Sequence, residues 1–277
     1  NSVSDIPTDT AEGNRLAGGF KTFGGVAGGN DDTSIVTGLL PNVWGMTLKA
    51  PTANGLDISA RLGLYTHMNG GDNSLGNGQI NLRETSGSVS GSFGTVLVGR
   101  SLGIHQSNAI LNDMLLFGVG AAASANNSNT TLGRIGLGYL YTDFQPQISW
   151  TLPGVDALNG NFGAKIGIFD PNTVAADTAA VSASDKHAPR VEAQVTYNGG
   201  LGDLGINLWV DGSYQNTERS ESEAAARTQH DAAGAMTNVV NDRDTDVDSA
   251  SVGFGTKVSY QGFSIVATGF FANAQGI

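Results

Sequence analysis

The chain contains segments of about ten residues in which every second side chain is apolar, and this alternation constrains its fold more than any other feature. The clearest copy is Leu56–Tyr65, in which apolar residues alternate with Asp57, Ser59 and Arg61. Because successive side chains of a strand point to opposite faces, the segment predicts a β-strand with one apolar and one polar face. A soluble sandwich contains similar strands, so the recurrence of the segments and the position of the charges must separate the two folds.

The composition favours a single-layered β-sheet wall over a fold with a large apolar core. Charged residues make up 14% of the 277 residues, against about 25% in typical soluble domains, and apolar residues only 39%. There is no cysteine, which excludes disulfides and thiolate metal sites. The net charge of −11 argues against nucleic acid as a partner. No apolar run approaches the ~18–20 residues of a membrane helix.

Strand-like segments recur about ten times and form five hairpins in which short turns alternate with long connections. Short turns at one end and long loops at the other are typical of transmembrane barrels with ~9–11-residue strands. Sandwiches spread loop length over both ends, and a solenoid would show one repeat length. The expected strands are Val43–Ala50, Leu56–Tyr65, Ile80–Ser90, Thr95–Leu102, about Leu137–Thr151, Phe162–Phe169, Arg190–Tyr197, Leu204–Tyr214, Ser251–Tyr260 and Phe263–Ala272.

Alternation within the expected strands places Arg61, Lys165, Arg190 and Lys257 on the polar face. A charge facing lipid costs ~2–4 kcal/mol near the membrane midplane, so we expect these residues to line a hydrated lumen. Taken singly, each favours the solvated face of a sandwich, and only the joint pattern favours a lumen.

One expected strand conflicts with this pattern. In Ile80–Thr85, placing Arg83 inward puts Glu84 on the side of Ile80 and Leu82. A β-bulge, a position at the water interface and a subunit contact each accommodate Glu84, and the sequence leaves all three open.

The segment Arg83–Arg100 resembles the general bacterial porin family. The similarity lies in a strand led by arginine, a turn of small residues and a second strand ending in Gly99-Arg100. Phe144–Trp150 and Ile168–Pro171 resemble the family's hairpin after its constriction loop. The resemblance spans roughly residues 43–272 and is sharpest in Arg83–Arg100.

The resemblance implies an all-β fold, a transmembrane antiparallel β-barrel of typically 16 strands that assembles as a trimer. It implies a single barrel domain over residues 1–277, with a loop at about residues 103–133 that folds inward and narrows the pore. Asp113 on this loop is then expected to face Arg61, Arg83 and Arg100, and opposed charges across a pore bias ion choice. A surface-loop carboxylate is an equally good interpretation of Asp113.

The chain departs from the family in its strand count and in its end. About ten strands are fewer than 16, and the sequence ends Ala274-Gln275-Gly276-Ile277 without a terminal aromatic strand. An open sheet edge cannot lie in lipid. Either terminal strands are absent from this chain or the barrel is smaller than expected, and we favour the first.

Other chemistry has little support in the sequence. His67, His105, His187 and His230 fall in expected loops without metal-ligand spacing, where solvated side chains are the simplest interpretation, and no serine lies in a nucleophile motif. We therefore expect no catalytic residue and no cofactor. Four alternate carboxylates resemble the opening of a calcium loop but lack its glycine and its glutamate, so a solvated acidic loop is favoured. These weak metal candidates are Asp242, Asp244, Asp246 and Asp248.

The sequence therefore predicts an outer-membrane porin for passive diffusion of small hydrophilic solutes and ions. Its expected partners are outer-membrane lipid, lipopolysaccharide, two further copies of itself in a homotrimer and the solutes, with no nucleic acid. The basic wall residues weakly favour anions. A structural or adhesive barrel protein acting through its extracellular loops is the second hypothesis, and a barrel enzyme is the third.

Overall fold

The computed structural model describes residues 37–38, 42–66, 80–116, 130–131, 134–136, 138–171, 188–218, 228–230, 236–238 and 246–273. Its elements are β1 (Thr37–Gly38), β2 (Asn42–Lys49), β3 (Asp57–Thr66), β4 (Asn81–Gly91), β5 (Gly94–Leu102), α2 (Ser107–Leu111), β6 (Thr130–Thr131), β7 (Phe144–Thr151), β8 (Val155–Ala157), β9 (Gly160–Phe169), β10 (Arg190–Leu201), β11 (Leu204–Glu218), β12 (Thr228–His230), β13 (Met236–Asn238), β14 (Asp246–Tyr260) and β15 (Phe263–Asn273). Within these ranges no helix is long and apolar enough to cross a membrane.

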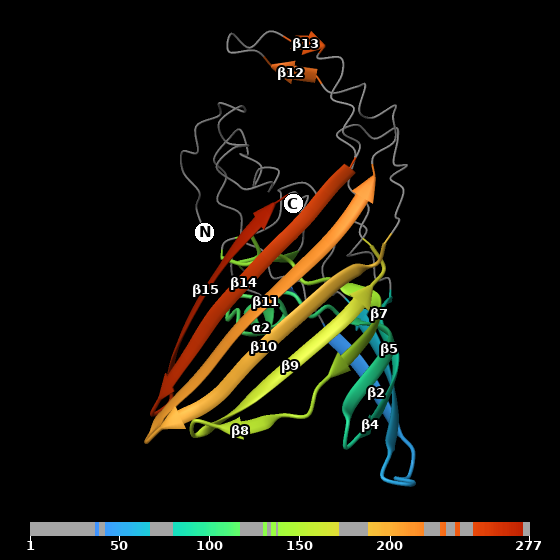
Figure 1. Cartoon of the computed structure of the whole chain (residues 1–277), viewed down its shortest axis with the longest axis vertical. Coiled ribbons are helices and arrows are strands. Elements are labelled where there is room, and N and C mark those ends of the chain that lie inside the picture. Colours follow the sequence, from blue (N-terminus) through green and yellow to red (C-terminus); the bar gives the residue numbers. More distant parts are fainter. Residues whose placement is uncertain are drawn as a thin grey trace.

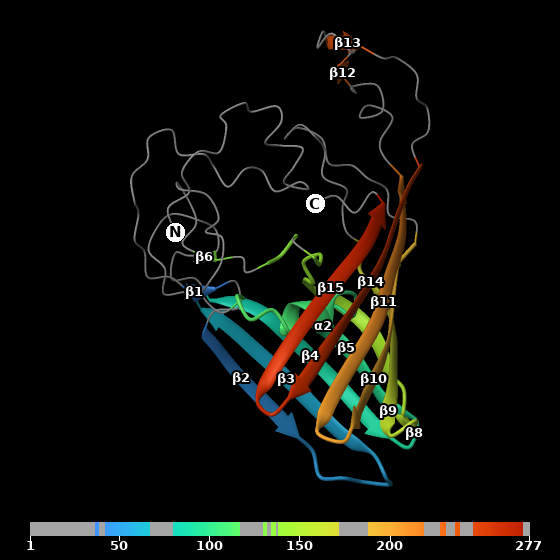
Figure 2. The same ribbon diagram turned by 90° about the vertical axis from the view of Figure 1, so that its left-hand side faces the viewer.

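Eleven of the strands form one antiparallel sheet in the order β15-β14-β11-β10-β9-β7-β5-β4-β3-β2, with β8 paired to β9. The order follows the chain, so each strand pairs with its sequence neighbours (Figure 1). The sheet curves strongly, and α2 lies on its concave side (Figure 2). Within the described residues β2 and β15 are the two edges, and the sheet is not closed. The fold is a curved wall of tilted antiparallel strands.

All ten strands expected from the sequence are present, and the prediction of an all-β antiparallel fold built from hairpins is confirmed. The short turns lie together at the lower end of the sheet in Figure 1. Three of them contain consecutive residues with positive φ: Asn54-Gly55 (54° and 73°), Leu158-Asn159 (53° and 57°) and Gln261-Gly262 (43° and 89°). Such pairs form the tight turns that match the twist of antiparallel strands, and glycine adopts positive φ without steric cost.

The strand expected at Leu137–Thr151 is shorter than predicted. Strand β7 begins only at Phe144, and a single bridge between Ile135 and Tyr139 precedes it. Gly136 and Gly138 have φ of 81° and 105°, outside the region that a strand allows. The apolar residues before Phe144 therefore belong to the end of the preceding loop.

The two faces of the sheet differ as the alternation predicts. In β10, Val191 and Val195 are exposed on the convex outer face, while Glu192 and Gln194 are buried on the concave inner face. Lys257 of β14 lies opposite Asn207 of β11 on the inner face. The inner face is therefore the polar one, and the large apolar side chains of the wall are mostly on the outside.

A β-bulge resolves the conflict around Glu84. The pairing of β3 with β4 shifts register between Gly63 and Leu64, which leaves Arg83 as an extra residue in β4. The side chain of Glu84 consequently lies inward, where its Oε2 accepts hydrogen bonds from Arg61 Nη2 at 3.1 Å and from the Tyr65 hydroxyl at 3.3 Å. The Arg83 guanidinium also points inward and stacks on the Tyr65 ring, 5.0 Å from its centroid. Of the three explanations, the bulge is correct.

Candidate functional site on the inner face

The chain turns inward immediately after β5 and lies against the inner face of β10, β11 and β14. Residues 103–116, called the inner segment below, contain the single short helix α2. Figure 2 shows this helix on the concave side of the curved sheet. Most of the inner segment is buried, so it fills part of the interior instead of extending into solvent.

Glu192 of β10 holds the start of the inner segment. Its Oε2 accepts hydrogen bonds from the backbone N–H groups of Ile104 (2.7 Å) and His105 (2.8 Å), and its Oε1 lies 2.8 Å from Arg190 Nη2. The side chain is only 2% exposed. Two residues further along β10, Gln194 Nε2 donates a hydrogen bond to the Ile104 carbonyl at 3.2 Å. Hydrogen bonds to a buried charge are the stronger kind, so Glu192 is the main anchor of the segment.

Asp211 of β11 holds the next residues. Its Oδ1 accepts the backbone N–H of Gln106 at 3.0 Å and lies 2.6 Å from His105 Nδ1. On the other side of the ring, His105 Nε2 lies 2.8 Å from Ser251 Oγ of β14. The inner segment is thus tied to three neighbouring strands of the wall.

The order Asp211, His105, Ser251 is that of a catalytic triad, but its surroundings do not suit one. All three residues are at most 4% exposed, so the Ser251 hydroxyl lies beyond the reach of a substrate. We interpret the trio as an anchor. The expectation that the loop histidines are solvated is wrong for His105, because the inner segment packs it against the wall.

An apolar cluster holds the remainder of the segment against the wall. It consists of Trp209 of β11 packed against five residues that precede β7: Ala109, Ile110, Leu116, Ile135 and Tyr139. A side chain at Gly255 on β14 would place its Cβ 2.2 Å from the Trp209 ring. Glycine at this position therefore gives the indole the room that it occupies.

The carboxylate of Asp113 is buried and hydrogen-bonded within its own loop. It accepts hydrogen bonds from the backbone N–H groups of Leu115 (3.0 Å) and Arg134 (2.7 Å) and from the Tyr139 hydroxyl (2.6 Å). Burial, and then the adjacent Asp113 carboxylate, raise the pKa of Tyr139, which stays a hydrogen-bond donor at neutral pH. Asp113 therefore ties the two ends of the loop together, and its place opposite Arg61, Arg83 and Arg100 stays a prediction.

The other predicted wall residues divide into paired and unpaired cations. Arg61 pairs with Glu84 at 3.1 Å and Arg190 with Glu192 at 2.8 Å. Lys165 and Lys257 lie on the inner face, and no described carboxylate lies within ion-pairing distance of either.

Arg100 lies on the opposite face from the one expected. It is paired with Thr85 and Pro146, while its neighbour Gly99 is paired with Gln147, which is buried on the inner face. Because side chains alternate along a strand, Arg100 points outward and is exposed. Its place in the expected pore lining is therefore corrected.

Most of the remaining candidates lie outside the part of the chain that the structure describes. Asp242, Asp244, His67 and His187 lie outside the described residues, as do the side chains of Asp246 and His230. Asp248 is exposed and accepts hydrogen bonds from the Tyr214 hydroxyl (2.8 Å) and Asn216 Nδ2 (3.0 Å). Within the described part of the chain, no group of three or more His, Asp or Glu residues could hold a metal ion.

Sequence reasoning missed the residues that anchor the inner segment. Glu192 and Asp211 each lie on the inner side of a central strand, Glu192 between Arg190 and Gln194 and Asp211 followed at alternate positions by Ser213 and Gln215. A carboxylate at such a position needs a partner, which is a signal available from the sequence. The partner itself, a loop 80 residues or more away, is given only by the fold.

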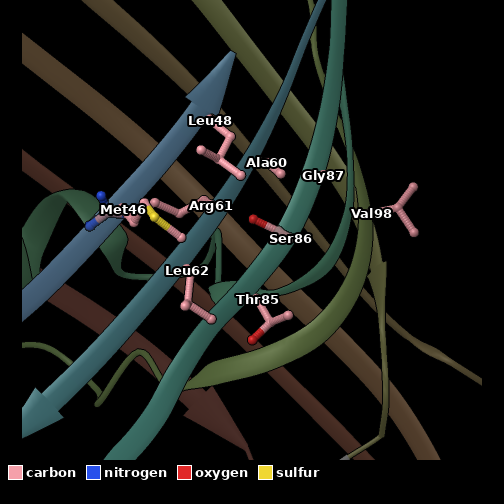
Figure 3. A pocket seen from close by; sticks show the side chains of 9 residues that line it. All are labelled: Met46, Leu48, Ala60, Arg61, Leu62, Thr85, Ser86, Gly87 and Val98. Carbon is pink, nitrogen blue, oxygen red and sulfur yellow. The ribbon is translucent and has the colours of Figure 1, made fainter. Parts of the chain in front are cut away.

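Two hollows lie on the sheet, one on each face. A hollow of about 550 Å³ on the inner face lies between Asn112 at the end of α2 and the lower parts of β10, β11 and β14. A smaller one of about 320 Å³ crosses β2–β5 and is lined mainly by apolar outward residues such as Met46, Leu48 and Leu62 (Figure 3).

No protein-family model and no curated protein matches the chain. Among solved structures, it is similar to the outer-membrane channel DcaP of Acinetobacter baumannii (11% identity, 86% of this chain and 68% of that one, TM-score 0.44). It is also similar to an anion-selective porin from Comamonas acidovorans (16%, 86% and 71%, 0.36) and to a loop-deletion mutant of the Vibrio cholerae outer-membrane protein OmpT (11%, 83% and 84%, 0.32). At identities of 16% or less, the similarities assign no function to this chain.

Proposed function

We propose that the chain is an outer-membrane porin, a β-barrel whose water-filled interior passes small hydrophilic solutes and ions by passive diffusion. The proposal rests on the distribution of polarity on the curved sheet, which is the reverse of that in a soluble protein: apolar side chains lie outside and polar side chains inside. Exposed apolar side chains cover the convex face, whereas charged and amide side chains line the concave face. Such a wall suits lipid outside and water inside.

The inner segment supports the same proposal. A loop that folds into the interior and is hydrogen-bonded to Glu192 and Asp211 narrows the passage without closing the barrel wall. Narrowing of this kind sets the size of the solutes that pass. We propose that the segment is the constriction of the channel and that the chain performs no catalysis.

Reconstitution in planar lipid bilayers tests the function. The purified protein is expected to produce stepwise increases in current at constant voltage, one step for each inserted channel. The liposome-swelling assay should admit monosaccharides faster than larger sugars. Protein that inserts into the membrane without any current would favour a structural or adhesive role, and protein that enters neither detergent nor lipid would favour a soluble sandwich.

We propose further that the outer face of β2–β5 is a contact between subunits of a homotrimer. Leu62, Thr85 and Arg100 form one row across this face, beside the hollow around Ala60 and Gly87 (Figure 3). Arginine facing lipid costs ~2–4 kcal/mol near the midplane, and a neighbouring subunit removes that exposure. The small residues Ala60 and Gly87 allow the sheet of a second subunit to approach closely.

Replacing Ala60 by tryptophan tests this contact. The indole would fill the hollow and stand in the way of a second subunit, so the A60W variant is expected to migrate as a monomer in native electrophoresis while the unchanged protein migrates as a trimer. The matched control is V195W, which adds the same ring to the exposed outer face of β10. Retention of the trimer by A60W would contradict the contact.

A further inference from the structure

A row of polar side chains crosses the inner face near the short turns. Asn198 of β10 lies opposite Asn207 of β11, and Asn207 lies opposite Lys257 of β14. Asn207 Nδ2 donates a hydrogen bond to Asn198 Oδ1. Together with Ser259 of β14 and Asn112 of the inner segment, these side chains line the hollow of about 550 Å³. Its lining contains one cation and no carboxylate.

The charge of Lys257 is not neutralised within the described residues. Lys257 is half-buried, and the carboxylates of Glu84, Glu192 and Asp211 are engaged by Arg61, Arg190 and His105 respectively. The same row of paired residues also contains a carboxylate, that of Asp156. It accepts a hydrogen bond from Asn161 Nδ2 at 2.8 Å. Four strand spacings, about 19 Å, separate the Asp156 and Lys257 positions along the row.

The amide and hydroxyl groups around this cation supply both donors and acceptors. Asn112 Nδ2 donates to the Asn108 carbonyl at 2.8 Å, and Ser259 Oγ lies 2.9 Å from Ser264 Oγ. Asn207 Oδ1 is buried without a hydrogen-bond partner among the described residues. A half-buried ammonium in a hollow lined by amide and hydroxyl groups can hold a carboxylate by charge and other polar groups of the same solute by hydrogen bonds.

We propose that this hollow is a binding subsite for small organic carboxylates, built on Lys257 with Asn198, Asn207, Asn112 and Ser259. The proposal rests on the porin function and specifies one solute class for it. A carboxylate that has passed the inner segment would pause at Lys257 before it leaves at the short-turn end. Weak and reversible binding raises the local concentration of the solute without blocking its passage.

Succinate is the probe, and the matched pair of variants is K257Q and K165Q. Both remove one lysine charge from the inner face, but only Lys257 lines the hollow. Titration calorimetry on the detergent-solubilised protein is expected to show that K257Q raises the dissociation constant for succinate about fivefold to tenfold, the size of a lost charge contact. K165Q should change it less than about twofold, because a separated surface charge contributes little. Circular dichroism establishes that both variants keep the strand content.

The outcomes separate the site from the channel. Equal weakening in both variants, or none in K257Q, would overturn the subsite, because only a diffuse lumen charge would then attract the probe. Ion current without Lys257-dependent succinate binding would overturn the subsite and leave the porin function standing. Lys257-dependent binding in a protein that carries no current would retain the subsite and overturn the porin function.

Discussion

Replacement of Glu192 by alanine is expected to release the inner segment from the wall and to widen the channel. The carboxylate is buried and engages two backbone N–H groups and the Arg190 guanidinium. Removing one partner of such a buried set typically costs about 3–5 kcal/mol, because the remaining charge and donors stay buried without partners. The single-channel conductance of E192A should therefore exceed that of the unchanged protein.

The absence of cysteine allows a direct measurement of this release. A cysteine introduced at Ala109, which is 2% exposed, should react slowly with a maleimide in the otherwise unchanged protein and rapidly in the E192A background. D57A removes an exposed carboxylate from the inner side of β3 and is the control, with labelling and conductance unchanged. Slow labelling in E192A would show that Glu192 is not the anchor.

Replacement of Trp209 by alanine is expected to destabilise the packing of the inner segment by about 3–5 kcal/mol, the usual cost of truncating a buried tryptophan. Trp209 is the one buried residue of the described wall in this cluster, against which Val266 of β15 also packs, and its ring fills the space over Gly255. The measurement is unfolding by guanidinium in detergent, followed by the same maleimide reaction at position 109.

Trp44 provides the matched control for this change. It lies on the outer face of β2 and is 72% exposed. With both tryptophan variants made in the A60W background, which lacks the proposed subunit contact, W44A should stay within about 0.5 kcal/mol of A60W alone, since it removes no buried contact of the single chain. If W209A and W44A unfold and label alike, the apolar cluster contributes nothing to the position of the segment.

Much of the wall was predictable because alternation and turn chemistry are local properties. The segment Leu56–Tyr65 forms β3 almost as predicted, and the Asn54-Gly55 turn before it has the expected positive φ values. The inward positions of Lys165 and Lys257 follow from the same period of two. These conclusions depend on residues that are neighbours in the chain.

The sequence left the face of a side chain open, as for Glu84, or predicted it wrongly, as for Arg100, where one residue more or less changes the face. Glu84 lies inward because a bulge adds Arg83 to β4. Arg100 lies outward because the residue before it, Gly99, is paired with the inward-facing Gln147 of β7. No short-range pattern in the sequence indicates either the bulge in β4 or the register of β5 with β7. The same holds for Asp113, whose partners include the distant Tyr139.

By itself, the sequence determined the strands, their hairpin pairing and the polarity of the two faces, because side-chain alternation and turn preferences act over a few residues. The tertiary structure alone decided which polar residues hold the inner segment and which remain open to a solute. Glu192 and Asp211 became anchors, and Lys257 stayed unpaired, only when the curvature of the sheet brought β10, β11 and β14 around residues 103–116.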